Sequence, residues 1–97
     1  MKLLVKDIAW GIDRRTGEKL EREVASELFE LDSLKTLSVG AVKKEIVVLE
    51  LKEDSVLLGL NKQGKTKELK VGERYTYAPM SFDGGHNYIL EVLKWNI

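Results

Sequence analysis

Apolar positions recur with a period of two along residues 3–12, which predicts a β-strand with one mainly apolar face. The next segment, Asp13-Arg14-Arg15-Thr16-Gly17-Glu18, is typical of a turn, because its Asp side chain can accept a backbone hydrogen bond and Gly17 can take a left-handed conformation. The chain is then expected to return from Lys19 to Val24 as the second strand of a hairpin.

Residues 20–34 carry two patterns at once. The residues Leu20, Val24, Leu28, Leu31 and Leu34 recur at helical spacing, and good helix formers lie between them. A short helix within residues 20–34 is therefore an alternative to a strand, and the pattern does not decide between them. Six acidic residues against one Lys and one Arg between positions 18 and 32 predict an acidic exposed face in either structure.

The pattern along the rest of the chain predicts four strands separated by short turns. These strands are expected at 45–52, 55–60, 66–77 and 88–97. Gly64 lies where a four-residue loop commonly needs a positive φ, and Gly72 indicates a bulge or bend inside the third of these strands. Pro79 ends that strand. The last strand is expected to be central, because it is apolar on both faces.

The predicted fold is mainly β and forms a single compact domain over residues 1–97, because a chain of this length holds one small core. Hairpins that follow one another at roughly 10 to 15 residues are typical of a small antiparallel β-barrel or β-sandwich, here of six to eight strands. The one addition left open is the short helix within residues 20–34.

Composition narrows the classes of function. Sixteen basic residues balance sixteen acidic ones, so no net charge draws the whole molecule to nucleic acid or to an anionic membrane. The absence of cysteine excludes disulfides, thiolate metal sites and cysteine nucleophiles. The apolar start of the chain is broken by Lys6 and Asp7, and no apolar run approaches the ~20 residues of a membrane span. We expect a soluble, cytoplasmic protein without a signal peptide or transmembrane segment.

The strongest candidate for a site is the segment 81–88, which holds the only histidine beside a Gly-Gly pair. Paired glycines allow a positive φ or a close approach of another group. We expect a ligand-binding or interaction loop made of Asp83, Gly84, Gly85, His86, Asn87 and Tyr88. The simpler interpretation is a hairpin loop in which the His and Asn side chains satisfy local backbone groups.

This composition offers few side chains of the types that carry out catalysis. A lone histidine lacks the partners of a nucleophilic site, and a zinc site usually takes three or four ligands that only carboxylates could complete here. The Gly-Gly pair precedes a predicted strand, whereas phosphate-binding loops precede a helix. We therefore expect no enzyme, no resident metal and no cofactor.

A basic stretch with interleaved tyrosines is the best sequence argument for nucleic-acid binding. Its members are Lys62, Lys65, Lys67, Lys70, Arg74, Tyr75 and Tyr77. Small β-barrels bind single strands with stacked aromatic rings beside Lys and Arg. The alternative is that the lysines cover the solvent face of a hairpin, and that the tyrosines are half-buried. Trp10 and Trp95 lie on apolar strand faces and are expected to pack in the core.

The resulting expectation is a binding or assembly module that engages a protein partner or a second copy of itself through a sheet face, an edge strand or the loop at 79–88. Two alternatives stay open. One is a single-strand nucleic-acid module built on the basic stretch, and the other is a small-ligand or metal site near Asp83 and His86.

Overall fold

The computed structural model describes residues 1–94, and every regular element in that range is a β-strand. The strands are β1 (Lys2–Ile12), β2 (Lys19–Glu30), β3 (Thr36–Val39), β4 (Lys44–Leu51), β5 (Ser55–Gly59), β6 (Thr66–Lys70), β7 (Arg74–Tyr77) and β8 (Gly84–Val92). Since residues 1–94 contain no helix, they contain none that is long and apolar enough to cross a membrane.

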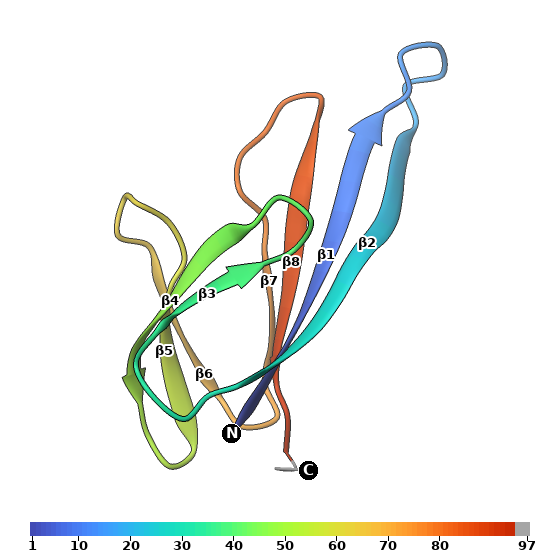
Figure 1. Ribbon diagram of the computed structural model, residues 1–97. Helices are drawn as coiled ribbons and strands as arrows, with labels where there is room; N and C mark the ends of the chain where they lie inside the picture. Colours follow the sequence, from blue (N-terminus) through green and yellow to red (C-terminus); the bar gives the residue numbers. More distant parts are fainter. Residues whose placement is uncertain (95–97) are drawn as a thin grey trace.

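The strands form two four-stranded sheets, in which all neighbours are antiparallel. The first sheet has the order β2-β1-β8-β7 and the second has the order β3-β4-β5-β6. The sheets face one another as two layers (Figure 1), and each keeps two open edges. The mainly β prediction is confirmed, with eight strands in an open sandwich-like arrangement.

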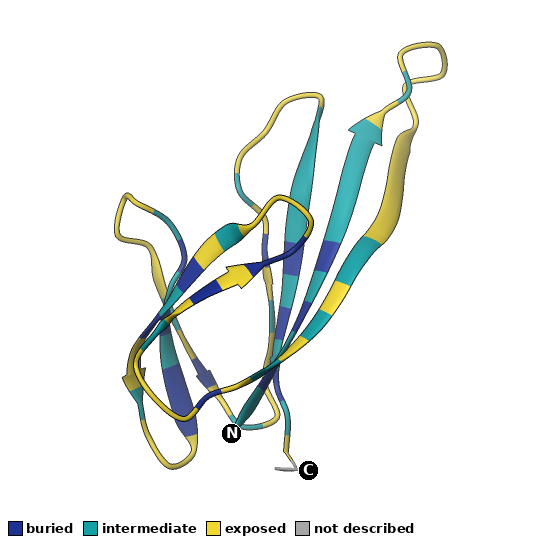
Figure 2. Cartoon of the chain, viewed as in Figure 1, coloured by how far each residue is buried: buried dark blue, intermediate teal, exposed yellow. Residues whose placement is uncertain are grey.

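The core lies between the two layers and includes inward-facing side chains from both sheets. Its buried members are Leu3, Val5, Leu31, Leu37, Val39, Ile46, Val48, Val56, Leu58, Leu60, Leu69, Tyr77, Tyr88, Leu90 and Val92. Figure 2 shows that these buried positions gather where the second sheet covers the first. Burial of this apolar area is the main force that holds the two sheets together.

The helix considered within residues 20–34 is absent, because β2 pairs with β1 over nearly its whole length. Ala25 lies opposite Asp7 and Glu23 lies opposite Ile8, so Val24 is an extra, bulged residue. A bulge changes the face on which later side chains lie. The helical spacing of apolar residues therefore reflects an interrupted strand.

The strand predicted over 66–77 is divided at Gly72, which takes a φ of 90°. β6 belongs to the second sheet and β7 to the first, so the turn at 71–73 carries the chain from one layer to the other. The backbone N–H of Gly72 donates to the carbonyl of Val92, which attaches this turn to β8. The left-handed conformations expected at Gly17 and Gly64 are confirmed, at 75° and 88°.

The last strand is central, as predicted, but it begins earlier than the sequence suggested. Gly84–Tyr88 belong to β8 and not to a loop, because β1 is long enough to pair with them as far as Gly84. Only Asp83 of the proposed site lies in a loop. Trp10 is outside the core, half-buried on the outer face of the first sheet, which corrects the expectation of core packing. Trp95 lies outside the described residues.

One end of the first sheet extends beyond the second (Figure 1), and the molecule measures 49 × 30 × 19 Å. We call this projecting part the arm; it comprises residues 8–12 of β1, 19–23 of β2, 84–87 of β8 and the turn at 13–18. The remainder, where the sheets cover each other, is the body. The loop at 78–83, which connects β7 to β8, lies beside the arm.

Candidate interaction and ligand-binding site

Asp7 is the buried polar residue at the junction of body and arm. It follows Leu3 and Val5 on the inward face of β1 and is 0% exposed. One carboxylate oxygen, Oδ1, lies 2.7 Å from Nδ1 of His86 on β8, and the other, Oδ2, accepts a hydrogen bond of 2.8 Å from the backbone N–H of Ala41. The carboxylate thus joins two strands of the first sheet to the turn between β3 and β4.

A second carboxylate holds the same turn. Oε1 of Glu27, on β2, accepts a hydrogen bond of 2.6 Å from the backbone N–H of Gly40. Gly40 has a φ of 76°, and a Cβ atom at this position would collide with Oδ2 of Asp7. Only glycine fits this conformation and this contact together. We call Asp7, Glu27, Gly40, Ala41 and His86 the clamp.

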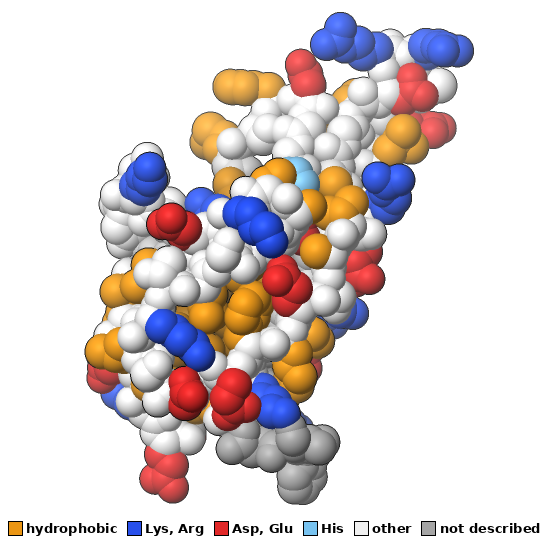
Figure 3. All heavy atoms as spheres, viewed as in Figure 1, with side chains coloured by type: hydrophobic (Ala, Val, Ile, Leu, Met, Phe, Trp, Pro, Cys, Tyr) orange, Lys and Arg blue, Asp and Glu red, His pale blue; other side chains and the backbone are white. Residues whose placement is uncertain are grey.

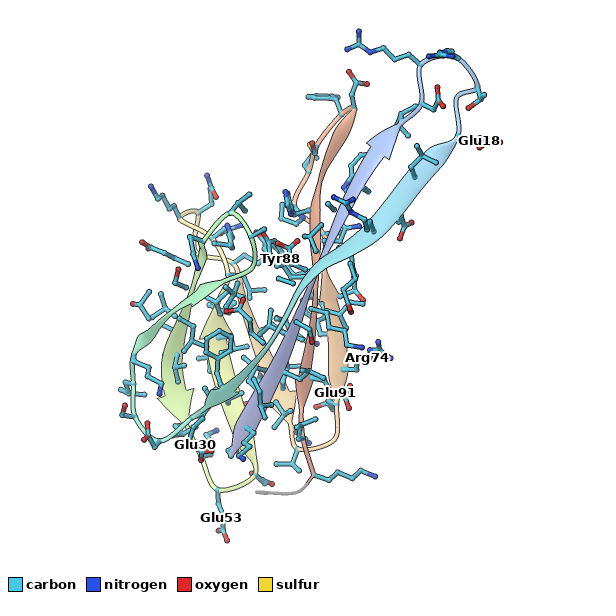
Figure 4. All side chains as sticks on the ribbon, turned by 45° about the vertical axis from the view of Figure 1, so that its right-hand side comes forward. Glu18, Glu30, Glu53, Arg74, Tyr88 and Glu91 are labelled. Carbon is cyan, nitrogen blue, oxygen red and sulfur yellow. The ribbon has the colours of Figure 1, made fainter. Side chains whose placement is uncertain are left out.

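Tyr88 lies next to the clamp on the inward face of β8 and is 2% exposed. Its ring stacks with His86 at a centroid distance of 6.4 Å and with Tyr77 at 6.3 Å. Burial raises the pKa of Tyr88 to about 12, and the negative charge of Asp7 adds to the effect. Figure 4 shows the Tyr88 side chain directed from β8 toward the second sheet.

The clamp can be compared with catalytic sites through its carboxylate–imidazole pair. In a nucleophilic triad, such a pair orients a base toward a hydroxyl or thiol. Here the hydrogen bonds of Asp7 connect His86 and the turn at 40–43, and no group of three or more His, Asp or Glu side chains in residues 1–94 is placed to hold a metal ion. The observed contacts fasten one sheet to the other.

The residues predicted at the Gly-Gly segment do not converge on one point. His86 pairs with Asp7, whereas Asp83 is exposed and contributes its backbone oxygen, which accepts a 3.1 Å hydrogen bond from Ile12 N–H. Asn87 lies opposite Ile8 in the ladder.

The Gly-Gly pair lies where another group approaches closely, which is one of the two roles expected for paired glycines. A Cβ at Gly84 would come within 2.9 Å of the Trp10 carbonyl oxygen, and one at Gly85 within 3.1 Å of Ser81. Both glycines let β8 lie tightly against β1 and the loop at 78–83. The pairing of His86 with Asp7 was not predicted, although a charged residue on the same face as Leu3 and Val5 is a usable signal for it.

The basic stretch is divided among separate surfaces. Tyr77 is 4% exposed and Tyr75 packs against the core, so neither ring is a free platform for a base. Lys67 lies over the Tyr75 ring at 5.0 Å, on the inward face of β6, whereas Lys70 is exposed. The remaining members lie apart.

Arg74 belongs to the other sheet, opposite Glu91, and Figure 4 shows both side chains pointing away from Tyr88. Lys62 and Lys65 both lie in the loop between β5 and β6. Together with Lys43 and Lys44 they border a groove on the second sheet.

The loop at 78–83 presents the two most exposed large apolar side chains among the described residues. Met80 is 94% exposed and Phe82 is 89% exposed. Figure 3 shows hydrophobic side chains on this loop beside the arm, and Lys and Arg side chains at the far end of the arm. Exposed apolar side chains that gather in one place indicate an interaction surface.

No protein-family model, no curated protein and no solved structure matches this chain. The fold and the geometry of its surfaces are therefore the basis for functional inference.

Proposed function

We propose that this protein is a non-catalytic binding module that takes an extended segment of a partner protein onto the free edge of β8 in the arm. The observation that carries the proposal is the pair of exposed side chains Met80 and Phe82 next to an edge that has no strand partner. Addition of a strand to an open sheet edge is a recurrent mode of peptide recognition.

The free edge follows from the unequal lengths of the neighbours of β8. β1 pairs with β8 as far as Gly84, whereas β7 stops at Tyr77, opposite Tyr88. Within the described residues, 84–87 therefore have β1 on one side and no strand on the other. Such an edge presents backbone N–H and C=O groups that can pair with another chain.

The hydrogen-bond alternation of the ladder shows which groups face the edge. Ile12 N–H donates to the Asp83 carbonyl and Leu93 N–H donates to the Lys2 carbonyl. Because backbone groups alternate in direction along an antiparallel strand, the N–H and C=O groups of Gly84 and His86 point away from β1. The Ser81 hydroxyl already donates to the Gly84 carbonyl. His86 thus offers a donor and an acceptor to an incoming strand.

Two features suit this edge to a partner segment. The backbone N–H and C=O of His86 both face this edge. The exposed Met80 and Phe82 provide apolar contact area beside the backbone pairing, and aromatic residues and Met are enriched at protein interfaces.

The test compares two exposed apolar residues at different places. Tagged wild-type protein, Phe82→Asp and Leu34→Asp are used to capture proteins from the native cell extract at moderate salt. Leu34 is 64% exposed but lies in the connection between β2 and β3, remote from the loop at 78–83. The proposal expects the same discrete protein with wild type and Leu34→Asp, and its loss with Phe82→Asp.

A second measurement locates the contact. A peptide from the captured protein should change the NMR amide signals of 84–87 and give cross-strand contacts to the His86 amide. The proposal is overturned if Phe82→Asp retains the partner, if the peptide changes signals only elsewhere, or if the sole effect of Phe82→Asp is to separate copies of the chain from one another.

A further inference from the structure

A groove of about 560 Å³ lies on the second sheet, on the side that faces away from the core. Its lining comes from the turn before β4, from β4 and β5, and from the loop between β5 and β6. The lining residues used below are Lys43, Lys44, Val47, Leu49, Gly59, Lys62 and Lys65. The volume lies within the range of small-molecule sites, roughly 300–1,000 Å³.

The floor of the groove is flat and apolar because of one bulge and one glycine. Val47 pairs with Gly59, and the ladder slips by one residue between Val48 and Glu50, which leaves Leu49 as the extra residue. Leu49 lies against Gly59, where a Cβ atom would be 3.2 Å from its Cδ1. The missing side chain at Gly59 gives room to the Leu49 side chain, so Leu49 and Val47 form an aliphatic floor.

The rim of the groove is basic. Four lysines line it, against the carboxylate of Glu45. The ammonium groups of Lys44 and Lys65 lie over the buried Tyr77 ring, so Lys43 and Lys62 are the cations left for the rim. In the part of the chain that the structure describes, none of these four ammonium groups lies within 4.0 Å of a carboxylate; the lysines in ion pairs are Lys6, Lys19, Lys35 and Lys52. The positive charge around this groove is therefore not neutralised by neighbouring side chains.

The backbone at the rim adds an independent observation. Lys43 has a φ of 56°, in the left-handed region that non-glycine residues seldom occupy. Conformations of this kind are often found at binding sites, where the surrounding structure holds them in place. Figure 3 shows separate Lys or Arg side chains at this end of the second sheet, with an Asp or Glu side chain between them.

We propose that the groove binds a small organic anion in which a flat apolar group carries a phosphate. The apolar group would lie on Val47 and Leu49, and the phosphate would reach Lys43 and Lys62. Apolar area and unpaired positive charge meet in this one concavity, which is the combination such a ligand requires. This site is independent of the free edge of β8.

The groove is less suited to a nucleic-acid strand. Stacking of successive bases needs exposed aromatic rings, and none of the aromatic residues within 1–94 lines the groove. The nearest ring described is that of Tyr77, which is buried, with Lys44 at 5.6 Å and Lys65 at 5.9 Å from its centroid.

The experiment is an NMR titration of the whole chain with phenyl phosphate, with inorganic phosphate and benzyl alcohol as partial probes at matched ionic strength. We expect saturable changes in amide signals at the groove with phenyl phosphate, and binding at least about tenfold weaker for either partial probe. The proposal is overturned if the changes do not saturate at millimolar concentration, if they lie outside the groove, or if inorganic phosphate binds equally well.

Two sets of variants test the two halves of the site. The double variant Lys43→Gln/Lys62→Gln should weaken phenyl phosphate by about tenfold, because it removes charge-assisted contacts. The matched double variant Lys52→Gln/Lys70→Gln removes the same charge from the same sheet outside the groove and should have little effect. Equal effects of the two pairs would show only general electrostatic attraction and would overturn the site.

The floor is tested by Gly59→Ala, whose added Cβ would displace the Leu49 side chain. It should weaken phenyl phosphate and leave the affinity for inorganic phosphate unchanged. If Gly59→Ala alters the fold, seen as changed amide signals across the sheet, Leu49→Ser provides the same test by making the floor polar. Tighter binding of an oligothymidine strand than of phenyl phosphate, lost in Lys43→Gln/Lys62→Gln, would assign the groove to nucleic acid and overturn the proposal.

Discussion

The same strand, β1, passes through two regions of very different character. In the body its inward side chains are Leu3 and Val5, which are 0% and 1% exposed. In the arm the corresponding positions are Ala9 and Gly11, which are small and only partly buried. Body and arm therefore share backbone hydrogen bonds, but only the body has a hydrophobic core.

The boundary between the two regions is set by the length of the second sheet. Its strands end at the turn 40–43, and the clamp closes the body at that turn through Asp7 and Glu27. Beyond this point the arm has side-chain contacts mainly on its outer face, where Lys19 lies 5.2 Å from the centroid of the Trp10 ring.

The difference teaches how a small protein can combine stability with an available edge. The body supplies the burial that stabilises the fold. The arm is held by pairing to β1, and sheet regions with few buried apolar contacts open at lower free energy than a core. An edge that must accept another chain is best placed in such a region. The residues that stabilise the fold and the residues proposed to bind a partner thus lie in different parts of the same strands.

The largest expected effect comes from shortening matched leucines in the two regions. Leu58 is fully buried in the body, whereas Leu20 is 55% exposed in the arm. Leu58→Ala should lower the free energy of unfolding by about 3 to 5 kcal/mol, because it leaves a cavity. Leu20→Ala should change it by less than about 0.5 kcal/mol.

Urea denaturation of both variants checks this contrast, with the slope of the transition as control for a changed unfolded state. Similar losses in the two variants would mean that the arm contributes to the core, and the distinction between body and arm would have to be abandoned.

The next effect concerns the boundary itself. Asp7→Ala removes the acceptor for Ala41 N–H and the partner of His86, and we expect a loss of about 2 to 3 kcal/mol in the free energy of unfolding. Asp7→Asn keeps an oxygen toward Ala41 and should lose less. Glu53→Ala, at an exposed turn shown in Figure 4, is the matched control and should change the free energy by less than about 0.5 kcal/mol.

Thermal and urea unfolding measure these losses, and NMR amide signals show where they act. Changes for Asp7→Ala should be concentrated at 40–43 and 84–88. A loss no larger than that of Glu53→Ala would show that the clamp does not hold the sheets together.

The sequence predicts the strands and turns better than their arrangement. Period-two alternation and the glycines at turns are local signals, and they correctly indicated β1, the hairpin turn at Gly17 and the break at Gly72. The same local signals do not show that β6 and β7 lie in different sheets, because that depends on pairing between distant strands.

The errors fall mainly where the arm begins. A bulge at Val24 made a strand resemble a helix, and Trp10 was expected in the core although it lies on the outer face of the first sheet. The candidate segment around His86 was correctly singled out as a place of close approach, but its partner Asp7 is 79 residues away. Such a contact follows from strand pairing, which one sequence does not reveal.

The smallest of these expected effects, at Tyr88, tests how completely the last covered position of β8 is shielded. Because burial raises its pKa to about 12 from an ordinary value of 10.0, Tyr88 is neutral in both the folded and the unfolded state below pH 10. Between pH 10 and 12 only the unfolded state ionises, so the free energy of unfolding should fall by roughly 2 kcal/mol and then level off. Tyr88→Phe removes this contribution and leaves the rest of the chain unchanged, so the difference between the two plots of unfolding free energy against pH isolates Tyr88. Asp7→Asn should narrow the window, since the charge of Asp7 is a second cause of the raised pKa. Parallel curves for wild type and Tyr88→Phe would place the phenol in contact with water, and would move the boundary of the body inward from Tyr88.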